Sequence, residues 1–348
     1  MNDGRFPAQS PIPAKVSRRR FLQISAAAAS GVALPGFGAE SPRRLVRRGV
    51  LLGAETEIQL YHRDTQAARA TIDACLTEVR QLEAIFSLHQ PGSALSSLNS
   101  AGRLTDPPTE LVELLNIAAR FSHATGGAFD VTVQPLWTLY ARHFASGSAD
   151  PEGPALPEIR RALARVDYRE ISVRDSVVAF TRPGMAVTLN GIAQGFITDR
   201  VAQMLRLRGF EHVLVNMGEM RALQGHPDGS SWRVGIADPA QPFRSLTTLP
   251  LREQAIATSG GYGTRFDAGG RHHHLFDPRT GTSANYYRSV SVIAPDATTA
   301  DALSTGLSAL SPEAARSVLE AYPQSSAIFI AADGSSRTAG LPISNAGG

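Results

Sequence analysis

The sequence predicts a mixed α+β fold, and three observations lead to that prediction. Stretches with a two-residue apolar period alternate with stretches of helical period from about residue 50 onward. With 43% hydrophobic and 19% charged residues, the composition is that of a globular protein able to bury a core. Breaks that contain Pro and Gly separate the stretches, and no internal repeat is visible.

The first half of the chain is expected to contain one strand and two long helices. Residues 51–61 alternate as in a strand, and residues 67–86 have helical periodicity. The turn that ends this helix finishes at Ser93, which is suited to cap a short helix after it. Residues 109–124 predict a second amphipathic helix, closed by glycines. Residues 145–157, rich in small residues, Pro and Gly, are expected to form a surface loop.

The second half begins with two short strands over 166–180, joined by a polar turn at Arg174-Asp175. A short strand that ends at Leu189, a helix over 192–208 and a buried strand over 210–217 then predict a strand–helix–strand unit around residues 185–217. Gly209 is expected to end its helix. Later elements are expected to be strands at 232–236, 255–258, 288–293 and 327–330, and helices at 299–310 and 312–322.

The N-terminal segment has the pattern of a twin-arginine export signal. Ser17-Arg-Arg-Arg-Phe-Leu22 precedes an Ala-rich apolar run over 24–37, which is too short and too rich in Gly and Ala for a membrane span. The sequence therefore predicts a signal segment over 1–39, a Pro/Arg-rich linker over 40–49, one domain over 50–340 and a tail over 341–348. The mature protein is expected in the periplasm. An Arg-rich disordered tail is the alternative.

Charge and residue counts exclude several function classes. The formal net charge is +3, but residues 1–39 hold five of the 34 basic residues and one of the 31 acidic ones. The remainder is nearly neutral, so nucleic-acid binding is not expected. The only lysine, Lys15, lies in the signal segment, which excludes Schiff-base, P-loop and lysine general-base chemistry from the mature domain. The single cysteine, Cys75, lies in an apolar helical stretch and is expected to pack in the core.

The most informative stretch runs from His274 to Gly281 and is followed by Asp301 and Thr305. It places an imidazole, a carboxylate, a guanidinium and a hydroxyl around a turn that contains Pro and Gly. Asp301 and Thr305 are four residues apart and share one face of a helix. Oxygen ligands on a rigid element suit a hard cation that holds a phosphate, and His274 with Asp277 fits an acid–base pair. Surface helices often carry Asp and Thr at this spacing, so the pair alone names no substrate.

Glycine-rich loops and a histidine run offer further candidate sites. Asn190-Gly-Ile-Ala-Gln-Gly195 opens a helix after a strand, where amides and the helix dipole favour an anion, although a tight structural turn would use the same glycines. Thr125-Gly-Gly-Ala-Phe-Asp130 could meet the polar edge of a ring or a ribose, or could simply end a helix. The run His272–His274 suggests a zinc site. However, the side chains of neighbouring residues in an extended chain point to opposite faces, and the sequence has no Cys or second His cluster to complete such a site.

In their order along the chain, these motifs resemble the ApbE family of FAD:protein FMN transferases. The resemblance covers roughly residues 50–312. The segments that carry it are 86–99, 125–130, 190–199, 216–219, 232–236, 258–262, 274–281 and 300–305. It implies an ApbE, T-fold-like mixed sheet-and-helix architecture. It also implies a magnesium-dependent transfer of FMN from FAD to a threonine hydroxyl of an exported protein, with release of AMP.

The resemblance also implies roles for individual residues. Asp301, Thr305 and the carbonyl of Gly191 would hold Mg²⁺. His274, oriented by Asp277, would be the base that activates the acceptor hydroxyl. The cation would neutralise the pyrophosphate and the charge that develops on the AMP leaving group. The FAD site would include Leu52, His89, Ala128, Phe129, Asp130, Thr188, Gln194 and Leu275.

The chain departs from the family pattern on one side of the expected site. Family members often have a lysine where this chain has Gln194 and an aspartate where it has Thr188, while His89 and Leu52 replace a tyrosine and a methionine near the flavin. Residues 188–195 resemble a NosX-like branch, which implies a membrane regulator of nitrous oxide respiration, or another electron-transfer protein, as acceptor. Two alternatives stay open: hydrolysis of FAD to FMN and AMP, and non-catalytic flavin binding or delivery in the periplasm.

Overall fold

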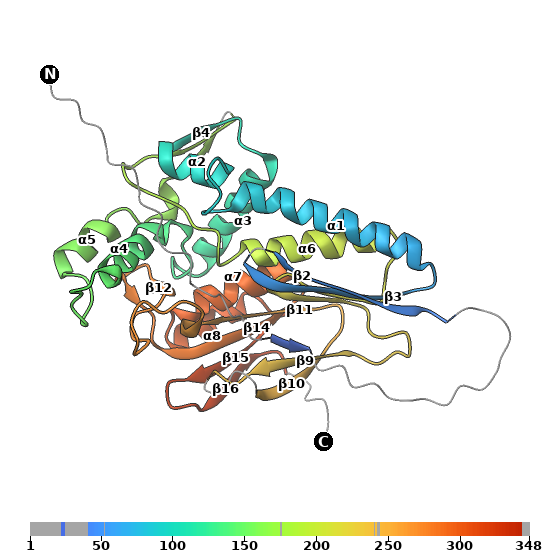
Figure 1. Cartoon of the computed structure of the whole chain (residues 1–348). Coiled ribbons are helices and arrows are strands. Elements are labelled where there is room, and N and C mark those ends of the chain that lie inside the picture. The colour runs from blue at the N-terminus through green and yellow to red at the C-terminus, as the bar shows by residue number, and fades with distance from the viewer. Residues whose placement is uncertain are drawn as a thin grey trace.

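An eight-stranded antiparallel sheet forms the centre of the structure (Figure 1). The computed structural model describes residues 22–24, 41–51, 53–174, 176–239, 241 and 244–342. The predicted mixed α+β class is confirmed, and the main sheet is antiparallel at every pairing. In spatial order its strands are β16 (Ser336–Gly340), β15 (Ser326–Ala331), β14 (Tyr287–Ala294), β11 (Ala255–Gly260), β8 (Met220–Leu223), β7 (Val213–Asn216), β3 (Ala54–His62) and β2 (Arg43–Leu51).

Three helices cover one face of this sheet: α1 (Thr65–Phe86), α6 (Ala193–Leu207) and α7 (Ala297–Ser308). Helix α1 begins where the Asp64 carboxylate accepts hydrogen bonds from the amides of Gln66 and Ala67. Each large apolar side chain that it buries contributes about 1.5–3 kcal/mol, so burial of one stripe holds this helix in place. The stripe has helical spacing and consists of Ala68, Ile72, Cys75, Val79, Leu82 and Phe86.

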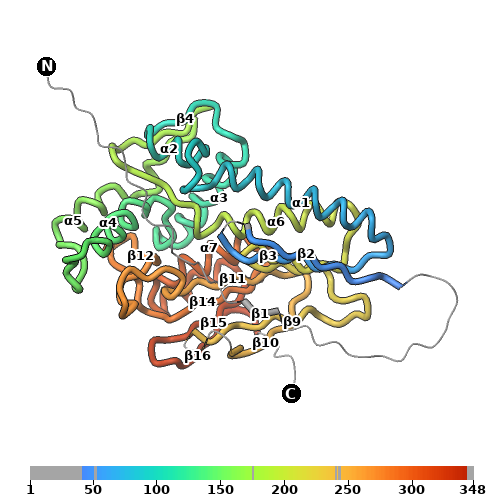
Figure 2. The backbone as a smooth tube through the Cα atoms, viewed as in Figure 1, coloured from blue at the N-terminus to red at the C-terminus, as the bar shows by residue number. Residues whose placement is uncertain are grey.

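A smaller sheet packs on the opposite face of the large one. It consists of β1 (Leu22–Ile24), β9 (Trp232–Ala237) and β10 (Ser245–Leu251), with β9 in the middle (Figure 2). Trp232 and Ile236 of β9 share an apolar cluster with Leu214 and Ile256 of the large sheet. The central strands are therefore buried on both faces, which explains the continuous apolar run of β7.

Shorter elements surround one end of these layers. Helices α2 (Ala94–Ala101) and α3 (Thr109–Ala124) accompany a sheet of β4 (Arg103–Thr105), β6 (Val177–Phe180) and β5 (Ile171–Arg174). A separate small core joins α4 (Gln134–Ala145), α5 (Leu156–Leu163) and the hairpin of β12 (Phe276–Asp277) and β13 (Thr282–Ser283). Helix α8 (Pro312–Glu320) contacts β16, and short 3-10 turns are η1 (Val131–Val133), η2 (Tyr168–Glu170) and η3 (Gly261–Gly263).

Most of the predicted elements are confirmed, together with two of their end signals. The Ser93 hydroxyl accepts a hydrogen bond from the Ser96 amide and so caps α2. Gly209 follows α6 with a φ of 81°, a conformation that glycine adopts at little cost. Helix α3 has the predicted bounds, and α1, α6, α7, β5, β6, β9, β11, β14 and β15 lie within a few residues of theirs.

Two expectations about elements were wrong. The segment at 43–49, expected to be a linker, belongs to edge strand β2, which is held by its ladder to β3 although Leu45 is its only buried residue before position 50. The strand expected to end at Leu189 does not form, so the unit around 185–217 lacks its first strand. The Asn99 side chain bonds both the amide and the carbonyl of Val187. The Asn99 side chain thus occupies the amide and the carbonyl of Val187, which would otherwise pair with a neighbouring strand.

The predicted export signal lies outside the described residues except for residues 22–24. Leu52, the predicted flavin contact, also lies outside them. Within the ranges that the structure describes, no helix combines the length and the apolar character needed to cross a bilayer.

Candidate active site

A cleft opens beside the N-terminal end of α6, bordered by α7, by the C-terminal end of β11 and by the β12 segment. It encloses about 1110 Å³ of non-protein space, part of which is open to solvent. The cleft brings together seven of the residues predicted for the site: Phe129, Asp130, Thr188, Gly191, His274, Leu275 and Thr305.

The lining of this cleft contains few charged groups. Its ionisable side chains are Asp130, Tyr262 and His274, and none of its lining residues, all of which the structure describes, is an arginine. An anionic ligand would therefore meet hydroxyl groups, backbone dipoles and any bound cation rather than a fixed positive side chain.

The three predicted metal ligands meet where α6 begins against α7. The Thr305 hydroxyl oxygen lies 3.5 Å from the Gly191 carbonyl oxygen, although the two residues are 114 positions apart. Ser259 at the end of β11 lies 3.1 Å from the same Thr305 oxygen, hydroxyl to hydroxyl. One turn earlier on α7, the Asp301 carboxylate accepts a hydrogen bond of 3.0 Å from the Gly195 amide and is only 1% exposed.

The close approach of the two helices depends on Gly195. A Cβ at this position would collide with the main-chain oxygen of Ala297, so no other residue fits without a shift of one helix. Asp199, one turn further along α6, accepts hydrogen bonds from the amides of Ala297 and Thr298 and from the Thr298 hydroxyl. It thereby satisfies the first amides of α7 and fixes the helix that carries Asp301.

The Asp199 carboxyl has a partner and is strongly desolvated. Arg221 lies 3.3 Å from one of its oxygens. Burial nevertheless raises the pKa of Asp199, against the opposing effects of its hydrogen bonds and of the Arg221 charge. The bonds of Asp199 thus fix the junction between α6 and α7, because a buried polar group that lost them would find few other partners inside the protein.

The oxygen atoms at this junction fit a magnesium ion. One buried carboxylate, one hydroxyl and one main-chain carbonyl are hard ligands of the kind that Mg²⁺ takes when substrate phosphates and waters complete its shell. In the described part of the chain, no group of three His, Cys, Asp or Glu side chains is placed to hold a metal. The ligands considered at the junction include only one carboxylate, so they are not a cluster of that kind.

His274 lies in the cleft, but Asp277 does not orient it as expected. The Nδ1 atom of His274 lies 3.2 Å from the main-chain oxygen of Thr264, which can only accept, so Nδ1 is the donor and the neutral ring keeps its lone pair on Nε2. Both oxygens of Asp277 are bonded by Arg279, which also donates to the Ala309 oxygen. The expectation for Asp277 was therefore wrong: an arginine two residues away competes successfully for the carboxylate.

The two histidines that precede His274 have other surroundings. His273 is buried, its Nε2 lies 3.2 Å from Asn285 Oδ1, and its amide donates to Ser283. Burial lowers the pKa of His273. His272 packs against the rings of Tyr140 and Phe144. The three imidazoles thus have different partners, although the rings of His273 and His274 meet edge-on with their centroids 6.5 Å apart.

The loop at 125–130 shapes another part of the cleft. The Thr125 hydroxyl accepts a hydrogen bond from the Phe129 amide and closes the loop after α3. Phe129 and Asp130 line the cleft, whereas Ala128 is buried behind it. One Asp130 oxygen accepts from Thr132 and the other from the Tyr168 amide. These hydrogen bonds make Asp130 the cap of η1 as well as a cleft residue. Burial raises the pKa of its carboxyl.

The departures from the family pattern do not all face the cleft. Gln194 is buried and lies behind Gly218, which lines the cleft. The Gln194 side-chain amide is so close to Gly218 that a Cβ at position 218 would collide with it. His89 is exposed and does not line the cleft. The expected anion site at the start of α6 is largely occupied, because the amides of Ile192 and Ala193 donate to the Leu189 oxygen.

Sequence reasoning missed some of the residues that build this site. Trp137 of α4 and Tyr262 line the cleft. The helical spacing of Leu136, Leu139 and Tyr140 could have revealed α4 and placed Trp137 beside a buried face. Asp199 lies in a segment used for the family resemblance, but no local pattern indicates that its partner is the start of α7.

Comparisons with known proteins show which family this chain resembles. The model of the ApbE family matches residues 52–329. A FAD:protein FMN transferase of Treponema pallidum (strain Nichols) is 31% identical over 315 residues, covering 84% of this chain and 85% of that protein. Another, of Vibrio cholerae serotype O1, is 31% identical over 297 residues, covering 82% and 87%.

Solved structures show the same architecture. The ApbE protein of Thermotoga maritima superposes with a TM-score of 0.75 at 27% identity, covering 85% of this chain and 97% of that one. The flavin transferase ApbE of Vibrio cholerae gives a TM-score of 0.73 at 26% identity, covering 85% and 96%. The similarity therefore extends over nearly the whole length of these proteins.

Proposed function

The chain belongs to the ApbE family, and from this premise we propose that it is a flavin transferase that moves FMN from FAD to a protein. The observation that carries the proposal is the meeting of His274, Thr305 and the Gly191 carbonyl in one cleft, with Asp301 one turn away on α7. A proton acceptor beside hard oxygen ligands is what transfer of a phosphoryl-linked group to a hydroxyl requires.

In the proposed reaction, the hydroxyl oxygen of an acceptor threonine attacks the phosphorus of the FMN half of FAD. The bond from this phosphorus to the bridging oxygen breaks, and AMP leaves with that oxygen. The proton of the hydroxyl passes to Nε2 of His274, while Thr264 holds the opposite side of the ring. The product is FMN joined to the threonine by a phosphoester.

Asp301, Thr305 and the Gly191 carbonyl would hold Mg²⁺, with the pyrophosphate of FAD among the remaining ligands. When bound, the ion supplies positive charge to the pyrophosphate and to the AMP leaving group. Because no arginine or lysine lines the cleft, we expect little substitute for that charge from side chains. Phe129, Leu275 and Trp137 offer apolar surface for the rings of FAD.

We propose that the acceptor is an exported or membrane-bound electron-transfer protein and that the transfer takes place in the periplasm. The twin-arginine pattern at residues 17–22 supports export of this chain. The resemblance of residues 188–195 to the NosX-like branch favours a membrane regulator of nitrous oxide respiration as acceptor.

The test is to incubate the protein with FAD, Mg²⁺ and the periplasmic and membrane proteins of a strain that lacks it. We expect flavin fluorescence that stays with one protein band after denaturation, together with release of AMP. Release of free FMN and AMP without a labelled band would contradict transfer and indicate hydrolysis of FAD. Unchanged FAD would contradict both and indicate a flavin-binding protein.

A further inference from the structure

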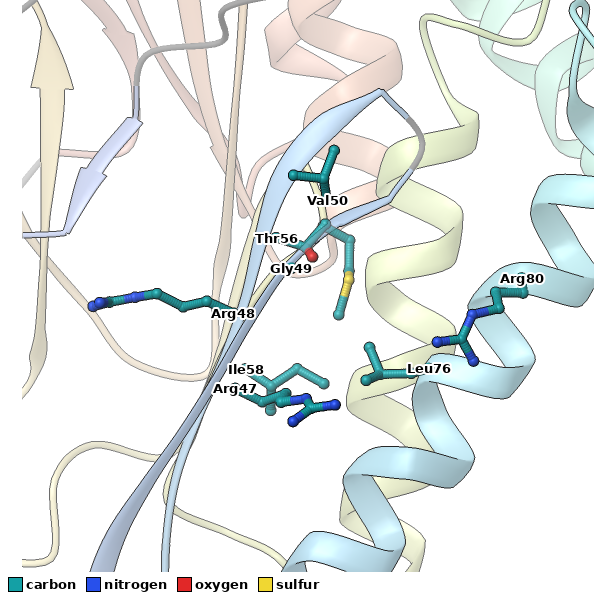
Figure 3. A pocket seen from close by; sticks show the side chains of 9 residues that line it. Arg47, Arg48, Gly49, Val50, Thr56, Ile58, Leu76 and Arg80 are labelled. Atoms are coloured by element: carbon teal, nitrogen blue, oxygen red, sulfur yellow. The ribbon is translucent and has the colours of Figure 1, made fainter.

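A second hollow lies outside the cleft, between edge strand β2 and helix α1 (Figure 3). It encloses about 430 Å³ of non-protein space, part of it open to solvent. Its floor is apolar, because Ile58, Leu76 and Met217 are buried there. Its rim is basic and none of its lining residues is acidic. We call this hollow the arginine groove.

Two arginines from different elements point into the arginine groove. Figure 3 shows Arg47 of β2 and Arg80 of α1 directed towards each other across Leu76. Neither forms an ion pair or hydrogen bond within the described residues, and both are exposed. Arg48 differs, since its side chain points to the other face of β2 and pairs with Glu57. Glu57 therefore neutralises Arg48, whereas Arg47 faces the groove with no counter-charge from the part of the chain that the structure describes.

The arginine groove and the cleft border neighbouring residues of the chain. Met217 lines the groove, and the next residue, Gly218, lines the cleft. Consecutive Cα atoms are about 3.8 Å apart, so the linings of the groove and the cleft come close together at this point. Strand β2 is also the last strand of the large sheet, so its outer backbone edge has no partner strand among the described residues. An extended segment can pair with such an edge.

On the basis of the proposed function, we infer that the arginine groove docks an acidic, extended segment of the acceptor protein and so places its threonine in the cleft. Carboxylates suit the site because a guanidinium binds a carboxylate through two parallel hydrogen bonds. The apolar floor would take an adjacent apolar side chain of the same segment. FAD itself would occupy the cleft, where His274 and Thr305 lie, and not the groove.

The test uses two labelled synthetic peptides and needs neither FAD nor Mg²⁺. One peptide carries carboxylates beside a single threonine; in the other, the same carboxylates are replaced by amides. Fluorescence anisotropy measures their binding to the full-length protein at low and high salt. We expect the wild type to prefer the acidic peptide, with a preference that weakens at high salt. The double variant Arg47→Glu/Arg80→Glu should bind that peptide about tenfold more weakly or worse.

A matched control makes the same change of charge outside the groove. Arg63 and Arg69 are exposed, lie before and within α1, and do not line the arginine groove. Arg63→Glu/Arg69→Glu should therefore keep the wild-type affinity to within a few-fold. Circular dichroism and the affinity for FAD should be unchanged in both double variants, which separates loss of the groove from loss of the fold.

Three results would overturn the inference. One is equal binding of both peptides by the wild type, and another is equal weakening in the two double variants. The third is self-association of Arg47→Glu/Arg80→Glu with unchanged peptide affinity, which would assign these arginines to protection of the sheet edge. FMN transfer without a preference for the acidic peptide would refute the groove alone. Preference for the acidic peptide without FMN transfer would refute the transferase alone.

Discussion

The two walls of the cleft are built in different ways. The junction wall, where α6 meets α7, holds Gly191, Gly195, Asp199, Asp301 and Thr305 on or beside regular helices with buried hydrogen bonds. The hairpin wall, residues 262–275 and β12, holds His274 on a segment with little regular structure. Charged groups of the junction wall are fixed from several directions by buried hydrogen bonds, whereas Nδ1 of the His274 imidazole bonds the main-chain oxygen of Thr264.

This difference matches the two tasks that we propose. Ligands for a small cation must keep their spacing, because Mg²⁺ tolerates little distortion of its shell. A base that meets a hydroxyl from a second protein must instead adjust as that protein docks.

Gly195→Val should have the largest effect, because it forces a side chain into the contact between α6 and the Ala297 oxygen. We expect a loss of about 3 kcal/mol or more in the free energy of unfolding, measured with denaturant. Gly147→Val is the matched control, since nothing lies within 4 Å of a Cβ at that position. A Gly195→Val protein as stable as the control would show that the junction wall is not tightly interlocked.

Asp301→Asn should abolish magnesium-dependent transfer while the fold survives. The asparagine keeps an oxygen that can accept the hydrogen bond from the Gly195 amide, but the negative charge is lost. We expect the transfer rate to fall about 100-fold or more, with unfolding changed by about 1 kcal/mol. A magnesium titration of the rate checks this, and a wild-type rate at all concentrations would remove Asp301 from the ligand set.

His274→Ala should slow transfer by about 100-fold or more, the usual contribution of a general base. Because the aromatic and apolar lining remains, the affinity for FAD should change by no more than a few-fold. Single-turnover rates and FAD titrations separate the two. His123→Ala, an exposed histidine of α3, is the control. An equal loss of FAD binding and rate would make His274 a structural residue instead.

The smallest effect concerns the response of the walls to acid. Burial lowers the folded pKa of His273 below its ordinary value of 6.5, so its contribution to stability is present above pH 6.5 and is lost as pH falls below it. Asp199 behaves oppositely. Burial raises its pKa in the folded protein, so the protonation of this carboxyl at low pH does not lower the free energy of unfolding. Lowering pH from 7 to about 5 should therefore loosen the hairpin wall, which contains His273, more than the junction wall.

Hydrogen exchange, corrected for the intrinsic effect of pH, measures this difference. We expect amides of the hairpin wall to lose protection by about a few-fold and those of α6 and α7 to keep theirs. His273→Gln, which cannot be protonated, should abolish the acid response of the hairpin wall. Equal loss of protection in both walls would contradict the comparison.

Several features of the site could be read from short stretches of sequence. The four-residue spacing of Asp301 and Thr305 placed both on one helix, and α7 contains both. The Ser93 cap and the glycine after α6 fixed helix ends within a residue or two. These signals depend on contacts within one turn of helix, so neighbouring residues carry all the information.

Other features could not be read in this way. The partner of Asp277 is Arg279 rather than His274, although all three lie within six positions, because side-chain direction in an irregular turn is not given by spacing. Gln194 reads as a site residue in the family pattern, yet it lies behind Gly218. Strand β2 has no clear alternation and forms because β3 offers it a complete ladder.

Short stretches of the sequence were enough to predict the fold class, the family and the residue types that we propose for binding FAD and a cation. The local period of apolar residues and the order of the motifs were sufficient for that. The tertiary structure was needed to find which distant groups come together: the Thr305 hydroxyl with the Gly191 carbonyl, Asp199 with the start of α7, and Arg47 with Arg80 in one groove. These pairs join segments far apart in the chain, and only packing of the layers brings them within reach.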